Sequence, residues 1–144
     1  MDPVVIPPPP PYRHRPVVLI VDDDQLVRDL AQRALSDEYN VLLAADGEEA
    51  LALLGMAEID AIVTDLLMPG VSGLDLAAAT EALEPHPKML FISGYGGKGE
   101  ELPGPLLAKP FLPEALRRAV RRLLKPAPPA SWGRAPSARR VSRP

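Results

Sequence analysis

The feature that most constrains this chain is a regular alternation between short apolar runs and segments whose apolar residues recur at helical spacing. The short runs have the length and composition of buried strands, and they cover residues 17–21, 39–44, 61–64, 89–92 and 106–108. The helical patterns between and after them cover residues 26–35, 46–54, 72–83 and 112–124. This alternation predicts an α/β fold with a doubly wound, five-stranded parallel sheet.

One unit of the alternation is incomplete. The segment 94–104, which joins the last two predicted strands, contains five glycines and one proline. Both residue types oppose helix formation. We therefore expect the fourth helix to be short, with at most one turn, or to be replaced by a loop.

Proline and charge separate the folded part of the chain from its ends. Of the 19 prolines, 12 lie in residues 1–16 and 126–144, and both segments lack periodic apolar residues. Residues 17–124 carry 18 acidic and 9 basic side chains, whereas the residues that follow carry five basic ones and no acid. We expect a folded domain over residues 17–125, a Pro-rich disordered segment before it and a Pro/Arg-rich disordered tail after it.

Several classes of protein are excluded by what the sequence lacks. It contains no cysteine, which rules out disulfide scaffolds and cysteine-ligated metal sites. The longest aliphatic run, residues 17–21, is far shorter than the roughly 20 residues that span a bilayer. The basic tail has a single aromatic residue and no nucleic-acid reader motif, so it is interpreted as a solvated end. We expect a cytoplasmic protein that binds neither membrane nor nucleic acid.

Polar side chains follow four of the predicted strands at the point where each strand ends. Asp22 and Asp23 follow the first strand, Asp65 the third, Ser93 the fourth and Lys109 the fifth. The carboxyl ends of parallel strands meet at one edge of a sheet, where ligand sites form. Clustered carboxylates suit a hard cation such as Mg²⁺, and one lysine beside them suits a phosphoryl group.

Each of these residues also has a plainer interpretation. Acidic residues at 22–24 favour the amino end of a helix, and Asp24 is expected to be the helix cap. Ser93 is also compatible with a simple turn, and Lys109 with a solvated lysine. The arginine pairs of the last helix are interpreted as a solvated face, and the proline run 7–11 as a stiff spacer.

Four sequence motifs, taken together, resemble the receiver domains of two-component response regulators. Each stands at the end of a predicted strand, and they follow one another in the family's order over residues 17–125. They are VVLIVDDDQLVR from Val17 to Arg28, DLLMPGVSG from Asp65 to Gly73, FISG from Phe91 to Gly94, and KPF from Lys109 to Phe111. The resemblance implies a flavodoxin-like receiver fold.

The resemblance also implies a role for each strand-end residue. Asp65 would be the phosphoacceptor, taking its phosphoryl group from a sensor histidine kinase or a phosphotransfer protein. The Mg²⁺ ligands would be Asp22, Asp23, Asp65 and the backbone carbonyl of Leu67. Ser93 and Lys109 would contact the phosphoryl group and form the switch. The family further implies a cis bond before Pro110.

Several features depart from the family pattern. Leu106 stands where the family has a switch aromatic, which puts the usual aromatic readout in doubt. The Gly-rich segment 94–104 resembles an atypical receiver subgroup in which a mobile loop replaces the fourth helix. Leu67 and Tyr95 occupy positions that tune the lifetime of the phosphoryl group, and neither positions a water molecule well. Slow autodephosphorylation is the expected result.

The sequence thus favours a stand-alone receiver that signals to a downstream protein and catalyses only its own phosphorylation and slow dephosphorylation. One alternative is a phosphorylation-independent interaction module with the receiver fold. A second is a small hydrolase or nucleotide-binding protein, but the phosphate-loop and nucleophile-elbow motifs are missing. A receiver that passes its phosphoryl group along a relay is a further variant.

Overall fold

A five-stranded parallel sheet forms the centre of the protein. The computed structural model describes residues 15–94 and 101–125, so the expected disorder of the two ends concerns residues that lie almost entirely outside the described part. The strand order is β2-β1-β3-β4-β5, and all pairs are parallel. The strands are β1 (Val17–Val21), β2 (Asn40–Ala44), β3 (Ala61–Asp65), β4 (Lys88–Ser93) and β5 (Leu106–Ala108).

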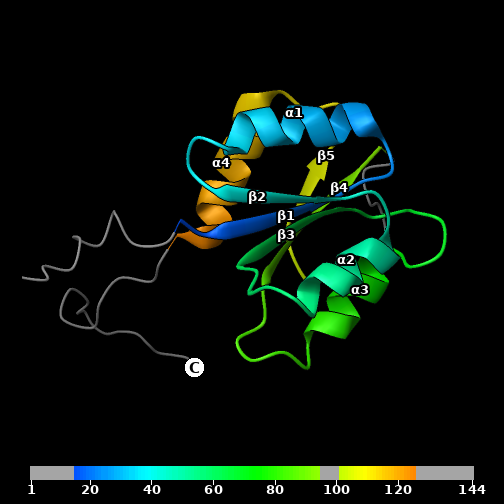
Figure 1. Ribbon diagram of the computed structural model, residues 1–144. Helices are drawn as coiled ribbons and strands as arrows, with labels where there is room; N and C mark the ends of the chain where they lie inside the picture. Colours follow the sequence, from blue (N-terminus) through cyan, green and yellow to red (C-terminus); the bar gives the residue numbers. More distant parts are fainter. Residues whose placement is uncertain (1–14, 95–100, 126–144) are drawn as a thin grey trace, which may run out of the picture.

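Helices cover both faces of this sheet, which confirms the doubly wound α/β architecture (Figure 1). On one face lie α1 (Gln25–Leu35) and α4 (Pro113–Leu124), and on the other lie α2 (Gly47–Leu54) and α3 (Gly73–Thr80). Successive side chains of a strand point to opposite faces. Val18 and Ile20 therefore pack in the core under α1 and α4, while Leu19 and Val21 pack in the core under α2 and α3.

Capping side chains begin the first three helices where the sequence predicts. Asp24 accepts a hydrogen bond from the amide of Leu26, and Asp46 accepts one from the amide of Glu49. Ser72 and Asp75 form a reciprocal capping box. These caps satisfy free amides in the first turn of each helix and fix where it begins. Helices α1 and α2 begin within four residues of the preceding strand, whereas α3 begins after the turn that follows Asp65.

The predicted end of α3 is wrong by three residues. The helix ends at Thr80 rather than Leu83, and the amide of Leu83 bonds back to the carbonyl of Thr80 in a turn. Pro85 and Pro87 follow closely, and a residue before proline is disfavoured in the helical region. The apolar spacing thus continues to Leu83, although the helical backbone ends at Thr80.

No helix separates β4 from β5 in the part of that connection that the structure describes. Residues 101–105 run without helix, and Leu102 packs against the core under α2 and α3. The amide of Phe91 donates to the carbonyl of Pro105 over 2.9 Å. Gly104 lies so close to Met89 that an added Cβ would overlap the Met89 carbonyl oxygen. Residues 101–105 thus lie against β4 without helix, and nothing in the described part of the connection contradicts the expected reduction of the fourth helix, while residues 95–100 lie outside the described residues.

The described chain enters and leaves at the amino edge of the sheet, opposite the strand ends that carry the polar residues (Figure 1). There Asp60 Oδ2 accepts a hydrogen bond of 2.7 Å from the amide of Val17, and the Asp60 carbonyl accepts one from the amide of Lys88. One aspartate therefore ties β1 to β4 at this edge. None of the helices in residues 15–94 and 101–125 is long and apolar enough to cross a membrane.

Candidate functional site

Three carboxylates meet at the carboxyl edge of the sheet. Asp22 and Asp23 follow β1, and Asp65 is the last residue of β3. One carboxylate oxygen from each lies within 4.8 Å of the other two. Asp22 is fully buried, Asp65 is nearly so, and Asp23 is exposed. Two of the three negative charges are therefore held out of water, where they repel each other unless a cation lies between them.

Lys109 supplies one such cation, and it follows the edge strand β5. Its Nζ lies 2.9 Å from Oδ2 of Asp22 and 3.2 Å from Oδ2 of Asp65. Lys109 directly follows β5, and its amide donates to the carbonyl of Ser93 at the end of β4. The peptide bond between Lys109 and Pro110 is cis, the isomer that the family resemblance implies. The polar residues that the sequence places at separate strand ends thus come together at one edge.

Burial and charge act in opposite directions on the pKa values of Asp22 and Lys109. Burial raises the pKa of Asp22, although the contact with the Lys109 ammonium and the hydrogen bond from the amide of Asp24 partly offset the effect. Burial alone would lower the pKa of Lys109, but its contacts with the Asp22 and Asp65 carboxylates and their negative charges outweigh burial and raise it. Lys109 is therefore held in its ammonium form at neutral pH.

Backbone groups orient the carboxylates. The amide of Asp24 donates to Asp22 Oδ1 over 2.8 Å, and the amide of Leu67 donates to Asp65 Oδ1 over 3.2 Å. Asp65 therefore has one oxygen against a backbone amide and the other against the Lys109 ammonium. This arrangement fixes the rotation of the Asp65 side chain, which is 12% exposed and so remains accessible from solvent.

The structure adds Arg28 to the residues that the sequence singles out. Its guanidinium Nη1 donates to the backbone carbonyl of Asp22 over 2.6 Å. Arg28 stands inside the first motif quoted above, but nothing in the spacing of that motif assigns it a contact. The one available signal is its position in the second turn of a helix, from which long side chains point back toward the amino end.

The remaining predicted positions lie around the carboxylates. Ser93 is buried at the end of β4, one residue beyond Ile92, which is paired with Asp65. The side chain of Leu67 is exposed beside the site, and Leu106 is half-buried against the core under α2 and α3. Tyr95 lies outside the described residues.

The residues present fit a magnesium ion. All three side chains offer oxygen, the donor that Mg²⁺ prefers. Among the described residues, Asp22 Oδ2 has an ionic contact with Lys109 but no hydrogen bond of regular geometry. That buried oxygen therefore retains capacity for a cation. Asp23, on the exposed side, adds a ligand at the mouth of the site.

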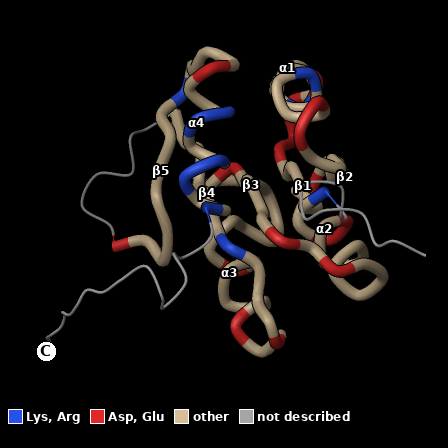
Figure 2. The backbone as a smooth tube through the Cα atoms, turned by 90° about the vertical axis from the view of Figure 1, so that its left-hand side faces the viewer, with Lys and Arg blue, Asp and Glu red and all other residues tan. Residues whose placement is uncertain are grey.

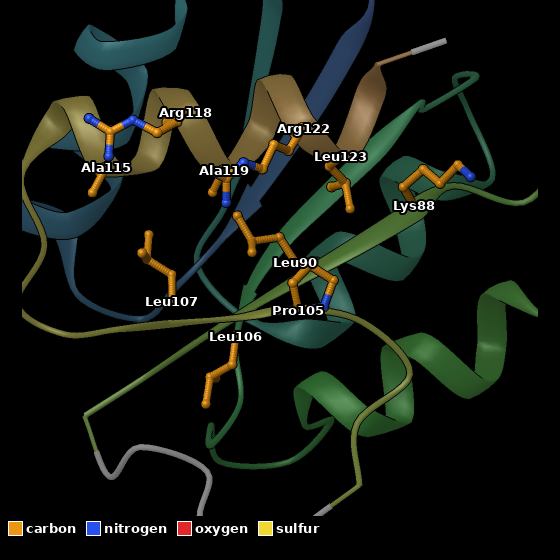
Figure 3. Close-up of a pocket in the computed structure, with 10 residues that line it drawn as sticks. All are labelled: Lys88, Leu90, Pro105, Leu106, Leu107, Ala115, Arg118, Ala119, Arg122 and Leu123. Carbon is orange, nitrogen blue, oxygen red and sulfur yellow. The ribbon is translucent and has the colours of Figure 1, made fainter. Parts of the chain in front are cut away.

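A separate groove lies between the sheet edge and α4, away from the carboxylates (Figure 3). It has a volume of 510 Å³, and its apolar lining includes Leu90, Leu107 and Leu123. Basic residues gather along α4 (Figure 2), and Arg118 and Arg122 line this groove together with Lys88. The groove is therefore apolar inside with three basic side chains, and none of the three carboxylates lines it.

Comparisons with known proteins agree with this geometry. Residues 18–102 match the family described as the response regulator receiver domain. The response regulator MprA of Mycolicibacterium vanbaalenii is 34% identical over 113 residues, which cover 74% of this chain. The match covers 49% of that relative, so the chain spans about half the length of the curated relatives it matches.

Solved structures give the same result for the fold. The chemotaxis response regulator CheY4 of Vibrio cholerae has 34% sequence identity and a TM-score of 0.65, covering 76% of this chain and 98% of its own. The receiver domain of the hybrid histidine kinase CckA has 35% identity and a TM-score of 0.65, covering 76% and 99%. The five-stranded sheet with its two helix layers is therefore shared with receiver domains.

Proposed function

The chain belongs to the response regulator receiver domain family, and from this premise we propose that it accepts a phosphoryl group on Asp65. The observation that carries the proposal is the convergence of Asp65, Asp22, Asp23 and Lys109 at one edge of the sheet. A receiver domain is a signalling domain of two-component systems. The site residues, the partners and the output of this chain belong to the proposal.

The proposed donor is a phosphohistidine on a sensor histidine kinase or a phosphotransfer protein. A carboxylate oxygen of Asp65 attacks the phosphorus, the phosphorus–nitrogen bond breaks, and the histidine leaves with its electron pair. The product is an aspartyl phosphate. Charge on the transferring oxygens must be neutralised during this step, and the Lys109 ammonium lies within 3.2 Å of the attacking carboxylate.

Asp22, Asp23, Asp65 and the carbonyl of Leu67 would hold Mg²⁺. When bound, the ion supplies a second positive charge against the phosphoryl oxygens. Asp22 has a further task, because its contact with Lys109 keeps that ammonium aimed at Asp65. The exposed carboxylate of Asp23 leaves the mouth of the site open to a donor from another protein.

The switch is proposed to start from the charge that Asp65 gains. A phosphoryl group adds between one and two negative charges and three acceptor oxygens at neutral pH. These oxygens compete with Asp22 for Lys109, and they attract the hydroxyl of Ser93. Ser93 is the last residue of β4, and Lys109 follows β5 and donates its amide to the Ser93 carbonyl. A shift of either residue would therefore move the carboxyl ends of β4 and β5 first.

The wider role follows from the same proposal. We place the receiver in residues 17–125, in the cytoplasm, as a protein that catalyses only its own phosphorylation and slow dephosphorylation. Its downstream target is a protein, and the groove with Lys88, Arg118 and Arg122 suits an acidic one. The alternative, a module that works without phosphorylation, has no need for the buried arrangement of Asp22, Asp65 and Lys109.

The test is the intact mass of the full chain after incubation with acetyl phosphate and Mg²⁺. We expect a gain of one phosphoryl group that requires Mg²⁺ and is lost in Asp65→Asn. Asp37→Asn removes an exposed carboxylate away from the site and should gain the group as the wild type does. Because Leu67 is apolar, the aspartyl phosphate should then persist for minutes or longer after the donor is removed.

Two results would oppose the proposal. Phosphorylation of Asp65→Asn would place the acceptor elsewhere, and a half-life of seconds would contradict slow dephosphorylation. If the wild type gains no group from acetyl phosphate or from a phosphorylated histidine kinase, and binds no Mg²⁺, the phosphorylation-independent module becomes the better assignment.

A further inference from the structure

Arg28 makes a contact at the carboxylate cluster that the proposed phosphoryl chemistry does not use. Its guanidinium donates to the backbone carbonyl of Asp22 over a short distance of 2.6 Å. The contact joins the second turn of α1 to the residue that directly follows β1. The inference below concerns the magnesium ligands and therefore rests on the proposed function.

The carbonyl of Asp22 belongs to the peptide unit that links a buried carboxylate to an exposed one. The peptide unit is planar, so fixing its oxygen also fixes the direction in which the chain enters Asp23. The other groups of Asp22 are already held: its amide donates to the carbonyl of Ala44, and its carboxylate accepts from the amide of Asp24. Arg28 bonds to the remaining polar group of Asp22, the carbonyl of the peptide unit that leads to Asp23.

Asp23 depends on that link for its place. Its side chain is exposed, and no hydrogen bond or ion pair among the described residues holds its carboxylate, yet one of its oxygens lies within 4.8 Å of those of Asp22 and Asp65. The direction of its backbone therefore determines how close its carboxylate comes to the other two. An arginine is suited to this task because its planar guanidinium holds a fixed geometry.

We propose that Arg28 is a positioning residue for the magnesium site. It holds the Asp22–Asp23 peptide so that the Asp23 carboxylate faces those of Asp22 and Asp65. For the Mg²⁺ affinity of a variant without Arg28, this role predicts a change opposite in sign to the effect of charge alone. A nearby cation repels Mg²⁺, so losing the charge of Arg28 should tighten metal binding if charge alone mattered. Losing the hydrogen bond should weaken binding if position matters.

The test compares Mg²⁺ binding by wild type, Arg28→Met and Arg28→Lys, measured by calorimetric titration of the full chain. Methionine keeps the length and helix propensity of the side chain but cannot donate. Outer contacts of metal ligands change affinity by roughly 10–100-fold, so we expect Arg28→Met to bind about tenfold more weakly. Arg28→Lys keeps a donor and the charge and should recover part of the loss.

Arg33→Met is the matched control. Arg33 lies on the same helix, is exposed and makes no hydrogen bond or ion pair with the described residues of the site, so its replacement removes one positive charge without removing a hydrogen bond. Its Mg²⁺ affinity should stay within about twofold of wild type. Metal-free nitrogen–proton spectra give a second readout, because the amide signal of Asp23 should shift in Arg28→Met and stay in place in Arg33→Met.

The outcomes separate the inference from the proposed function. If wild type neither binds Mg²⁺ nor is phosphorylated, the proposed function fails. If wild type does both and Arg28→Met binds Mg²⁺ as tightly as wild type or more tightly, the positioning role is overturned. Should Arg28→Met not fold, Arg28→Leu against Arg33→Leu gives the same comparison, because leucine also cannot donate, and equal affinity of those two variants overturns the role.

Discussion

The two sides of β3 are built differently. On the side of β1 and β2, each strand is followed by a capped helix, and the strands have five residues each. On the side of β4 and β5, residues 101–105 lie without helix against β4, and β5 has only three residues. The first side carries Asp22 and Asp23, and the second carries Ser93 and Lys109.

The difference between the two sides suggests that the site has two requirements, rigid placement of its carboxylates and freedom of movement for its hydroxyl and ammonium groups. Carboxylates that share a cation must be held within a few tenths of an ångström, and complete strand–helix units with caps provide that rigidity. On the proposed function, the side that contributes a hydroxyl and an ammonium can tolerate a simpler connection, because those groups would follow the phosphoryl group. Two departures from the family pattern, at Leu106 and in segment 94–104, fall on this second side, whereas Leu67 lies two residues after Asp65 of β3.

The strongest way to test the comparison is to remove Lys109, whose ammonium joins the second side to Asp22 and Asp65 at the carboxylate cluster. In Lys109→Met, the buried carboxylate of Asp22 faces Asp65 without a cation, and removing one partner of a buried pair costs several kcal/mol. We expect the free energy of unfolding to fall by about 3 kcal/mol at pH 7.5 in the presence of a chelator, measured by urea denaturation. Mg²⁺ should restore part of the loss.

The pH dependence of that variant has a definite sign. Burial already raises the pKa of Asp22, and without Lys109 the pKa rises further because Asp65 remains close. A raised pKa in the folded state means that folding favours the protonated form, so the variant gains stability relative to wild type as the pH falls from 7.5 to 5. A loss that stays constant over this range would contradict the buried ion pair, and Asp22→Asn combined with Lys109→Met should show no such change.

A smaller effect comes from two glycines, Gly73 beside the end of β3 and Gly104 beside β4. A Cβ at Gly73 would lie 2.6 Å from the Asp65 carbonyl oxygen, and a Cβ at Gly104 would overlap the Met89 carbonyl. Each Gly→Ala change should lower the free energy of unfolding by about 2 kcal/mol. Only Gly73→Ala should also slow phosphorylation, because its clash displaces Asp65. Equal slowing in Gly104→Ala would show that the two sides are not independent.

The smallest effect is expected at Gly55, which serves as the control for both glycines. It has an ordinary negative φ of −79° at the end of α2, and a Cβ there would approach no atom more closely than 3.6 Å. Gly55→Ala should therefore stabilise the protein by about 0.5 kcal/mol through the unfolded chain. A destabilisation in urea would indicate a contact at α2 that the structure does not contain.

Much of the fold follows from local signals in the sequence. Strand runs, helix periodicity and the caps Asp24, Asp46 and Ser72 each act over a few residues, and the parallel topology then brings Asp65 and Lys109 to one edge. The assignment of chemistry to these residues needed the motifs as well, because an aspartate at a strand end is also a good helix cap.

Other features required the folded chain. The contact of Gly104 with Met89 and that of Arg28 with the Asp22 carbonyl join segments through space, and neither has a local pattern. The predicted end of α3 is wrong because the apolar spacing continues to Leu83, while the prolines that follow disfavour the helical conformation in the residues before them. Sequence patterns thus predict elements better than they predict the contacts between elements.

The amino edge of the sheet has a practical consequence. Asp60 holds the start of β1 there, and α4 ends beside the first residue of β4, since Leu123 and Lys88 line the same groove. Five residues of strand, about 16 Å, separate this edge from the carboxylates. A tag, a fluorophore or a sensor surface joined next to residue 15 or residue 125 would therefore be attached on the side of the domain opposite the carboxylates, and the carboxylate cluster would face the solution.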